Sequence, residues 1–135
     1  MSIWSILAPI PKMHLEGALK VLEAKEFVLF GTENCRIFDQ TPIGSPVFIY
    51  LSHAGAASGV SYEGSYQGLV KDKTEMMKLE KAGYRPPIAC DESWSYYWKV
   101  NSITKLSIPR PLSDFQLASG KYVAGPPHKP LHVRN

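Results

Sequence analysis

The stretch Val47-Phe48-Ile49-Tyr50-Leu51 decides how this sequence is expected to fold. Its β-branched and aromatic residues favour extended backbone, and its unbroken apolar run is typical of a strand that is not half-exposed. A turn rich in proline and glycine precedes it over residues 41–46, and a loop of small residues follows it over residues 52–59. We therefore expect a strand here with neither face open to solvent.

Other short apolar and aromatic segments have the character of further strands. They are Ser2–Leu7, Phe27–Phe30, Cys35–Phe38, Val60–Val70, Ser93–Leu106, Lys121–Ala124 and Leu131–Val133. Pro9 is expected to end the first of these strands, and Pro109 and Pro111 the long aromatic one. Gly64 and Gly68, inside Val60–Val70, predict a bent or bulged strand.

Two segments are predicted to be helices. In His14–Lys25 one face carries apolar residues at helical spacing, namely Leu15, Ala18, Leu19 and Leu22. In Asp72–Ala82, Asp72 and Glu75 resemble a capping box, and Gly83 marks the end. A short helical turn is expected within Pro111–Ala118. Strand follows strand in the middle and end of the chain, so the sequence predicts an α+β domain, a small mixed barrel of about six strands with two main helices.

The bulk properties are those of one small globular domain over residues 1–135, with hydrophobic residues making up 44%. No apolar run is as long as a membrane span, and Met1-Ser2-Ile3-Trp4 is unlike the start of a secretory signal, so we expect no membrane partner and a cytoplasmic location. Cys35 and Cys90 form no Cys-x-x-Cys motif and are expected to be free thiols. We expect no metal and no cofactor, because the four histidines, His14, His53, His128 and His132, lack ligand spacing.

Positive charge is concentrated in the last part of the chain. Residues 99–135 contain several lysines and arginines and a single acid, Asp114, and we interpret residues 119–135 as a basic extension that closes the barrel. Such a charged segment can face the phosphates of a nucleic acid or simply aid solubility. The candidate phosphate contacts of the whole chain are Lys12, Lys71, Lys73, Lys99, Lys105, Arg110 and Lys121.

Three stretches within residues 2–117 carry a family resemblance. They are Ile3-Trp4-Ser5-Ile6-Leu7-Ala8-Pro9, Gly44-Ser45-Pro46-Val47-Phe48-Ile49-Tyr50-Leu51-Ser52-His53, and Trp98-Lys99-Val100 with the step Pro109–Leu112. In this order they resemble the PUA-like superfamily, especially its EVE branch and the related ASCH branch. The resemblance implies a domain that binds RNA or DNA, and the related YTH fold implies a modified base held in an aromatic pocket.

A pocket for one base needs flat aromatic faces and polar groups that read the edge of the base. The candidates for stacking are Trp4, Tyr50, Trp94, Tyr97 and Trp98, and those for hydrogen bonding are Thr32, Asn34, Ser52 and His53. Tryptophans are more often part of a core, and Trp98 is expected there because it alternates with Tyr96 and Val100 on one strand face. Trp94 is expected to be more exposed.

Two other functions fit the same residues. The resemblance to ASCH domains implies a small hydrolase acting on a modified nucleoside, although the ASCH motif Gly-x-Lys-x-x-Glu-x-Arg is not matched. Ser52 and His53 are not expected to form a nucleophile–base pair, because neighbouring strand residues point to opposite faces. The third possibility is a protein-interaction module, in which the aromatic residues meet a partner chain.

Overall fold

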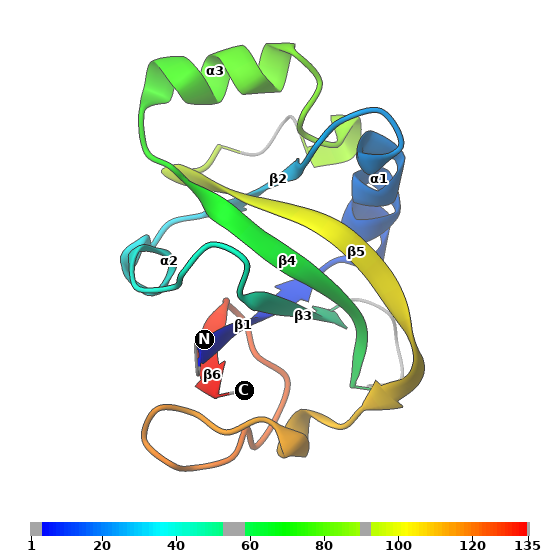
Figure 1. Ribbon diagram of the computed structural model, residues 1–135, viewed down its shortest axis with the longest axis vertical. Coiled ribbons are helices and arrows are strands. Elements are labelled where there is room, and N and C mark those ends of the chain that lie inside the picture. Colours follow the sequence, from blue (N-terminus) through cyan, green and yellow to red (C-terminus); the bar gives the residue numbers. More distant parts are fainter. Residues whose placement is uncertain (1–3, 53–58, 90–92, 135) are drawn as a thin grey trace.

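The computed structural model describes residues 4–52, 59–89 and 93–134 (Figure 1). In these ranges the strands are β1 (Trp4–Ile10), β2 (Val28–Thr32), β3 (Pro46–Leu51), β4 (Val60–Val70), β5 (Tyr96–Arg110) and β6 (Leu131–Arg134). The α-helices are α1 (Lys12–Leu22), α2 (Arg36–Asp39) and α3 (Lys73–Lys81), with 3₁₀ turns at Pro87–Ala89 and Leu112–Asp114. The predicted α+β class is confirmed. None of the helices in the described ranges combines the length and the apolar character needed to cross a membrane.

All six strands belong to one mixed sheet with the order β2-β5-β4-β3-β1-β6. β1 and β3 run parallel, and the other neighbouring strands pair antiparallel. β2 and β6 are the edge strands, and the described residues form no ladder between them. The sheet is therefore open, and β6, which lies in the predicted closing extension, pairs with β1 and makes one isolated bridge, between Val133 and Leu117.

The strand predicted from Val47–Leu51 is confirmed as β3, an inner strand of the sheet. Val47 and Ile49 are fully buried in the largest apolar cluster, while Phe48 and Tyr50 are buried in a second cluster on the opposite face. Because both faces are covered, the run needs no polar alternation.

The largest apolar cluster lies between the sheet and α1. Leu15 and Ala18 of α1 belong to this cluster together with strand residues that include Ile6, Val28 and Trp98. The opposite face of the sheet is covered in two places: Met76 of α3 packs near Leu29, Val70 and Tyr97, and Phe115 and Val123 pack near Leu7 and Phe48. In Figure 1 these two covers lie at opposite ends of the molecule.

Two predicted details of local structure are confirmed. The pairing of β4 with β5 shifts register between Glu63 and Ser65 and between Tyr66 and Gly68, at the two glycines expected to bulge the strand. At Gly64 a Cβ would lie 2.8 Å from a methyl group of Val100, so the two strands approach closely there. The Asp72 carboxylate accepts a hydrogen bond from the Glu75 backbone N–H at 3.0 Å and caps α3.

Three predictions about strands are wrong. Residues 35–38 lie in and around α2, not in a strand, because the Asn34 side chain accepts a hydrogen bond from the Arg36 backbone N–H and starts a helical turn. Residues 121–124 make only one isolated bridge, between Tyr122 and Gln116. The strand predicted to end at Pro9 continues to Ile10, whereas the long strand passes through Pro109 and ends at Arg110, just before Pro111, as the second of its two prolines predicts.

Pro9 and Pro109 are tolerated because each lies where one neighbouring strand is missing. Ile10 O accepts from Ser52 N, so the nitrogen of Pro9 faces the other side of β1, beyond the end of β6. Pro109 lies in the part of β5 beyond Val100, where only β4 pairs with the strand. A proline there removes no ladder hydrogen bond if its nitrogen faces the unpaired edge.

Candidate functional site

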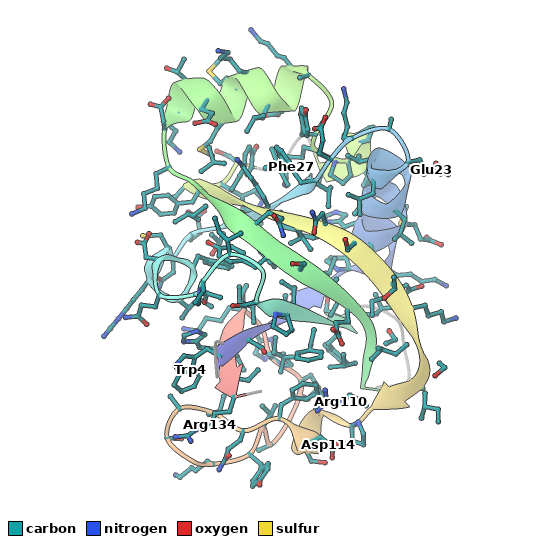
Figure 2. The ribbon with its side chains drawn as sticks, in the orientation of Figure 1. Trp4, Glu23, Phe27, Arg110, Asp114 and Arg134 are labelled. Atoms are coloured by element: carbon teal, nitrogen blue, oxygen red, sulfur yellow. The ribbon has the colours of Figure 1, made fainter. Side chains whose placement is uncertain are left out.

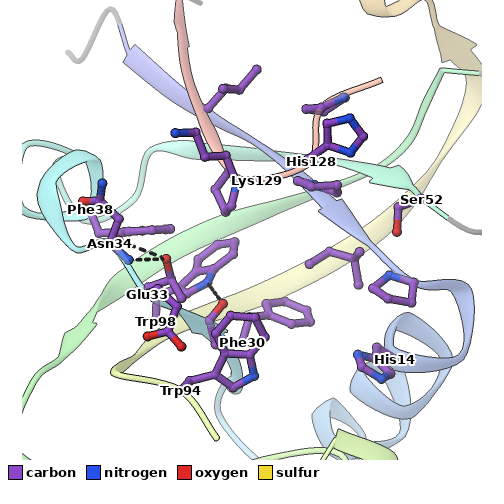
Figure 3. Close-up of a pocket in the computed structure, with 18 of the residues that line it drawn as sticks. His14, Phe30, Glu33, Asn34, Phe38, Ser52, Trp94, Trp98, His128 and Lys129 are labelled. Carbon is purple, nitrogen blue, oxygen red and sulfur yellow. Dashed lines mark hydrogen bonds between the residues drawn. The ribbon is translucent and has the colours of Figure 1, made fainter. Parts of the chain in front are cut away.

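A cavity of about 710 Å³ lies where the two edges of the open sheet approach each other. Leu29–Thr32 of edge strand β2 line it on one side, and Leu131 and His132 of edge strand β6 line it on another. The start of α1 and residues 126–130 also line it. Figure 3 shows Trp94, Trp98 and Phe30 on the side of the cavity away from His128 and Lys129. Its volume is in the range of small-molecule and cofactor pockets.

Trp94 lies directly against the backbone of β2. A Cβ built on Gly31 would overlap the Cγ, Cδ1 and Cδ2 atoms of the Trp94 indole, which are nearly equidistant from it. The indole therefore presents its face to Gly31, and only glycine leaves room for it. Trp94 is half-buried and lines the cavity, which agrees with its expected exposure.

The backbone of Trp94 and Ser95 is tied to two other elements. Ser95 donates hydrogen bonds from its backbone N–H and its hydroxyl to Glu33 Oε2, just after β2. Lys73 Nζ, at the start of α3, donates to Trp94 O at 3.2 Å and Ser95 O at 3.0 Å. These contacts hold the Trp94 indole in place over β2.

Trp98 lines the same cavity but belongs to the core, as its position in the strand predicts. Its side chain is almost fully buried, and its ring centroid lies 5.3 Å from that of Phe30 and 4.7 Å from that of Phe38. Its Nε1–H donates to Gly31 O at 3.4 Å. Because its ring already contacts Phe30 and Phe38, Trp98 forms part of the cavity wall and is less suited than Trp94 to stack on a ligand.

Thr32 and Asn34 form a small polar corner of the cavity. The Thr32 hydroxyl donates to Asn34 O at 2.9 Å, and Asn34 Oδ1 accepts from the Arg36 backbone N–H at 2.9 Å. Asn34 Oδ1 thus already accepts one hydrogen bond, and the side-chain amide group remains as a donor. Asn34 can therefore donate a hydrogen bond to an acceptor atom of a bound ligand.

Tyr50 and Ser52, at the end of β3, also line the cavity. The Ser52 backbone N–H donates to Ile10 O at 3.1 Å and extends the pairing of β3 with β1. Among the described residues, the Ser52 hydroxyl makes no hydrogen bond to a histidine. His53 lies outside the described residues.

Two predicted pocket residues lie away from the cavity. Tyr97 points to the opposite face from Trp98, where its hydroxyl donates to Glu80 Oε2 at 3.0 Å and the Arg85 guanidinium lies 4.8 Å from its ring centroid. Trp4 lies on β1, beside β6, and stacks on His132 with ring centroids 4.8 Å apart and planes 24° apart. Trp4 thus packs on His132, which lines the cavity, without lining the cavity itself.

The sequence interpretation missed the contribution of the C-terminal segment. Residues 126–132 line the cavity, including Lys129 and His132, and so does the buried Arg85. Arg85 donates from a guanidinium nitrogen to Leu29 O at 3.3 Å. The signal available was the basic, proline-rich character of residues 119–135, which was assigned to closing the barrel.

The predicted phosphate contacts do not gather around the cavity, and none of the seven lines it. Lys71 pairs with Asp39 at 2.9 Å, and Lys73 makes the backbone contacts described above. Lys99 lies 4.8 Å from the ring centroid of Phe27. Arg110 lies 4.5 Å from the ring centroid of Phe115, at the end of β5 remote from α3 (Figure 2). The others, Lys12, Lys105 and Lys121, are exposed.

Comparisons with other proteins add no identification. The chain matches no family model, no curated protein and no solved structure. The function is therefore inferred from the geometry of the cavity.

Proposed function

We propose that this domain binds nucleic acid and takes one base into the cavity, stacked on Trp94. The observation that carries the proposal is the Trp94 indole, which lies with one face on Gly31 and lines a cavity large enough for a flat ligand. Stacking of a base on an aromatic side chain contributes about 1–3 kcal/mol and tolerates any base, since every base has a π-face. A modified base fits the same proposal.

The fold supports the proposal through the family resemblance in the sequence. A curled six-stranded mixed sheet with α1 against its larger core fits a PUA-like domain whose barrel is open at the cavity. We propose that assignment for the fold, and the binding of RNA or DNA follows from it by resemblance.

The rim of the cavity supplies positive charge for the nucleic-acid backbone. Lys129 is exposed and lines the cavity, on the side away from Trp94 (Figure 3). A base stacked on Trp94 would bring its phosphates towards this rim. Contacts between lysines and phosphates release counterions, so affinity should fall as salt rises.

Binding of single-stranded RNA and DNA 12-mers, followed by fluorescence anisotropy at low and rising salt, tests the proposal. Trp94→Ala should weaken binding about five- to hundredfold, the loss of one stacked base. Met77→Ala is the matched control, because Met77 is exposed on α3 and lies outside the cavity. Lys129→Gln should reduce the slope of log affinity against log salt concentration by about one, because one phosphate contact is lost.

Two results would contradict the proposal. One is the absence of binding by any 12-mer at low salt. The other is a Trp94→Ala protein that is folded and binds as tightly as the wild type, since the base would then lie elsewhere.

A further inference from the structure

His132, on β6, lines the cavity, and one of its ring nitrogens is hydrogen-bonded to Thr41. His132 pairs with Ile6 of β1 through the backbone. Its Nε2 lies 3.0 Å from Thr41 Oγ1, and Thr41 does not line the cavity, whereas His132 does. The imidazole therefore spans from a buried hydroxyl to the cavity.

The hydrogen bonds of Thr41 fix which nitrogen of His132 carries the proton. The Thr41 hydroxyl has one hydrogen, and it donates this hydrogen to Ile37 O at 2.6 Å. Thr41 Oγ1 must then accept from His132, so the Nε2 atom carries the hydrogen. Burial lowers the pKa of His132, which keeps the ring neutral near pH 7. In this tautomer Nδ1 has a lone pair and no hydrogen.

The orientation of the ring is also fixed. The Trp4 indole stacks on His132, and the Arg134 guanidinium lies 5.6 Å from the Trp4 ring centroid. With Thr41 holding one edge and Trp4 one face, the imidazole loses little freedom when a ligand binds.

The polar side chains that line the cavity include donors and acceptors, and the Glu33 carboxylate can only accept. The Asn34 amide group remains as a donor, and Lys129 and Arg85 can only donate. Glu33 Oε2 already accepts from Ser95, whereas His132 Nδ1 would be left without a partner by a ligand that has no hydrogen to donate.

We propose that His132 Nδ1 accepts a hydrogen bond from an N–H group of the bound base and so selects bases that present one at this position. This inference depends on the proposed function and adds to it the chemical class of ligand. A ligand lacking that N–H leaves Nδ1 desolvated and unpaired, which typically weakens binding about tenfold.

Three pairs of 12-mers that differ at a single base test the selection. The pairs are adenine against purine, cytosine against 2-pyrimidinone, and uracil against N3-methyluracil; in each pair the second base lacks an N–H group. The wild-type protein should bind the first member about tenfold more tightly in at least one pair, and His132→Phe should bind both members of that pair equally. The Tyr122→Phe protein, altered at an exposed ring outside the cavity, should discriminate as the wild type does.

The tautomer can be measured without any ligand. The imidazole ¹⁵N shifts of His132 should show a hydrogen on Nε2 in the wild type, and Thr41→Val should populate the other tautomer and reduce the discrimination. This second variant keeps His132 in place, so it tests the role even if His132→Phe does not fold.

The outcomes separate this inference from the proposed function. If the 12-mers bind through Trp94 but no pair is discriminated, if discrimination survives in a folded His132→Phe protein, or if Nδ1 carries the hydrogen, the inference about His132 is wrong and base stacking stands. If no 12-mer binds, or binding ignores Trp94, the proposed function fails and the inference with it.

Discussion

The indole of Trp94 lies face-on against the backbone of Gly31, at a place on β2 where any side chain would collide with it. The contact joins an edge strand of the sheet to the residue that precedes β5. It also makes one face of Trp94 part of the protein and leaves the ring half-buried beside the cavity.

Gly31→Ala should displace Trp94. The new methyl group would overlap the indole, and overpacking of this kind costs about 1–3 kcal/mol of unfolding free energy. Urea denaturation measures the loss, and tryptophan emission reports the displacement. Gly125→Ala is the matched control, since a Cβ there meets nothing within 4 Å. Equal stability and emission in both variants would mean that Trp94 does not rest on Gly31.

Removing the N-cap of α3 should destabilise the protein by about 1 kcal/mol. In Asp72→Ala the Glu75 backbone N–H loses the carboxylate that accepts its hydrogen bond. The urea midpoint should fall. Thr74 is the exposed second residue of α3, and Thr74→Ala should leave the midpoint nearly unchanged. A wild-type midpoint in Asp72→Ala would show that the cap contributes nothing to stability.

Ile49→Ala should cost about 2–5 kcal/mol, because Ile49 is fully buried in β3 and its truncation leaves a cavity in the main core. Ile43→Ala removes the same atoms from a side chain that is 69% exposed, and should change stability by less than about 0.5 kcal/mol. Comparable losses in the two variants, measured in urea, would contradict the placement of β3 inside the sheet.

His132 should make stability depend on pH. Its pKa is lowered by burial, so the unfolded chain binds the proton more readily than the folded one. The contribution of His132 is fully present above its ordinary pKa of about 6.5 and is lost as the pH falls towards the folded value. Urea midpoints between pH 7 and pH 5 should fall for the wild type and fall less for His132→Phe. Identical slopes would show that burial does not perturb this histidine.

Much of the sheet could be predicted because its strands are marked locally. The run at β3 and the bulging glycines of β4 follow from side-chain chemistry within a few residues, and so does the cap of α3. The failure at Pro9 has a different origin. Whether a proline ends a strand depends on which neighbour lies beside it, and the sequence does not state the strand order.

The candidate site was predictable on one side only. Thr32, Asn34, Tyr50, Ser52, Trp94 and Trp98 lie around one cavity, as the pocket hypothesis requires. Tyr97 was misplaced because it alternates with Trp98 across the sheet. His132 was missed since its acceptor nitrogen is defined by Thr41, a partner 91 residues away in sequence.

The ladder between β1 and β6 joins residues 4–7 to residues 131–134, almost the full length of the described chain. Contacts so distant in sequence carry a large loop-closure entropy, so this ladder should form late in folding. During synthesis, the wall that carries His132 and Lys129 cannot exist until nearly all of these residues have been translated. We therefore expect the partly made protein to have its central sheet before it can capture a ligand.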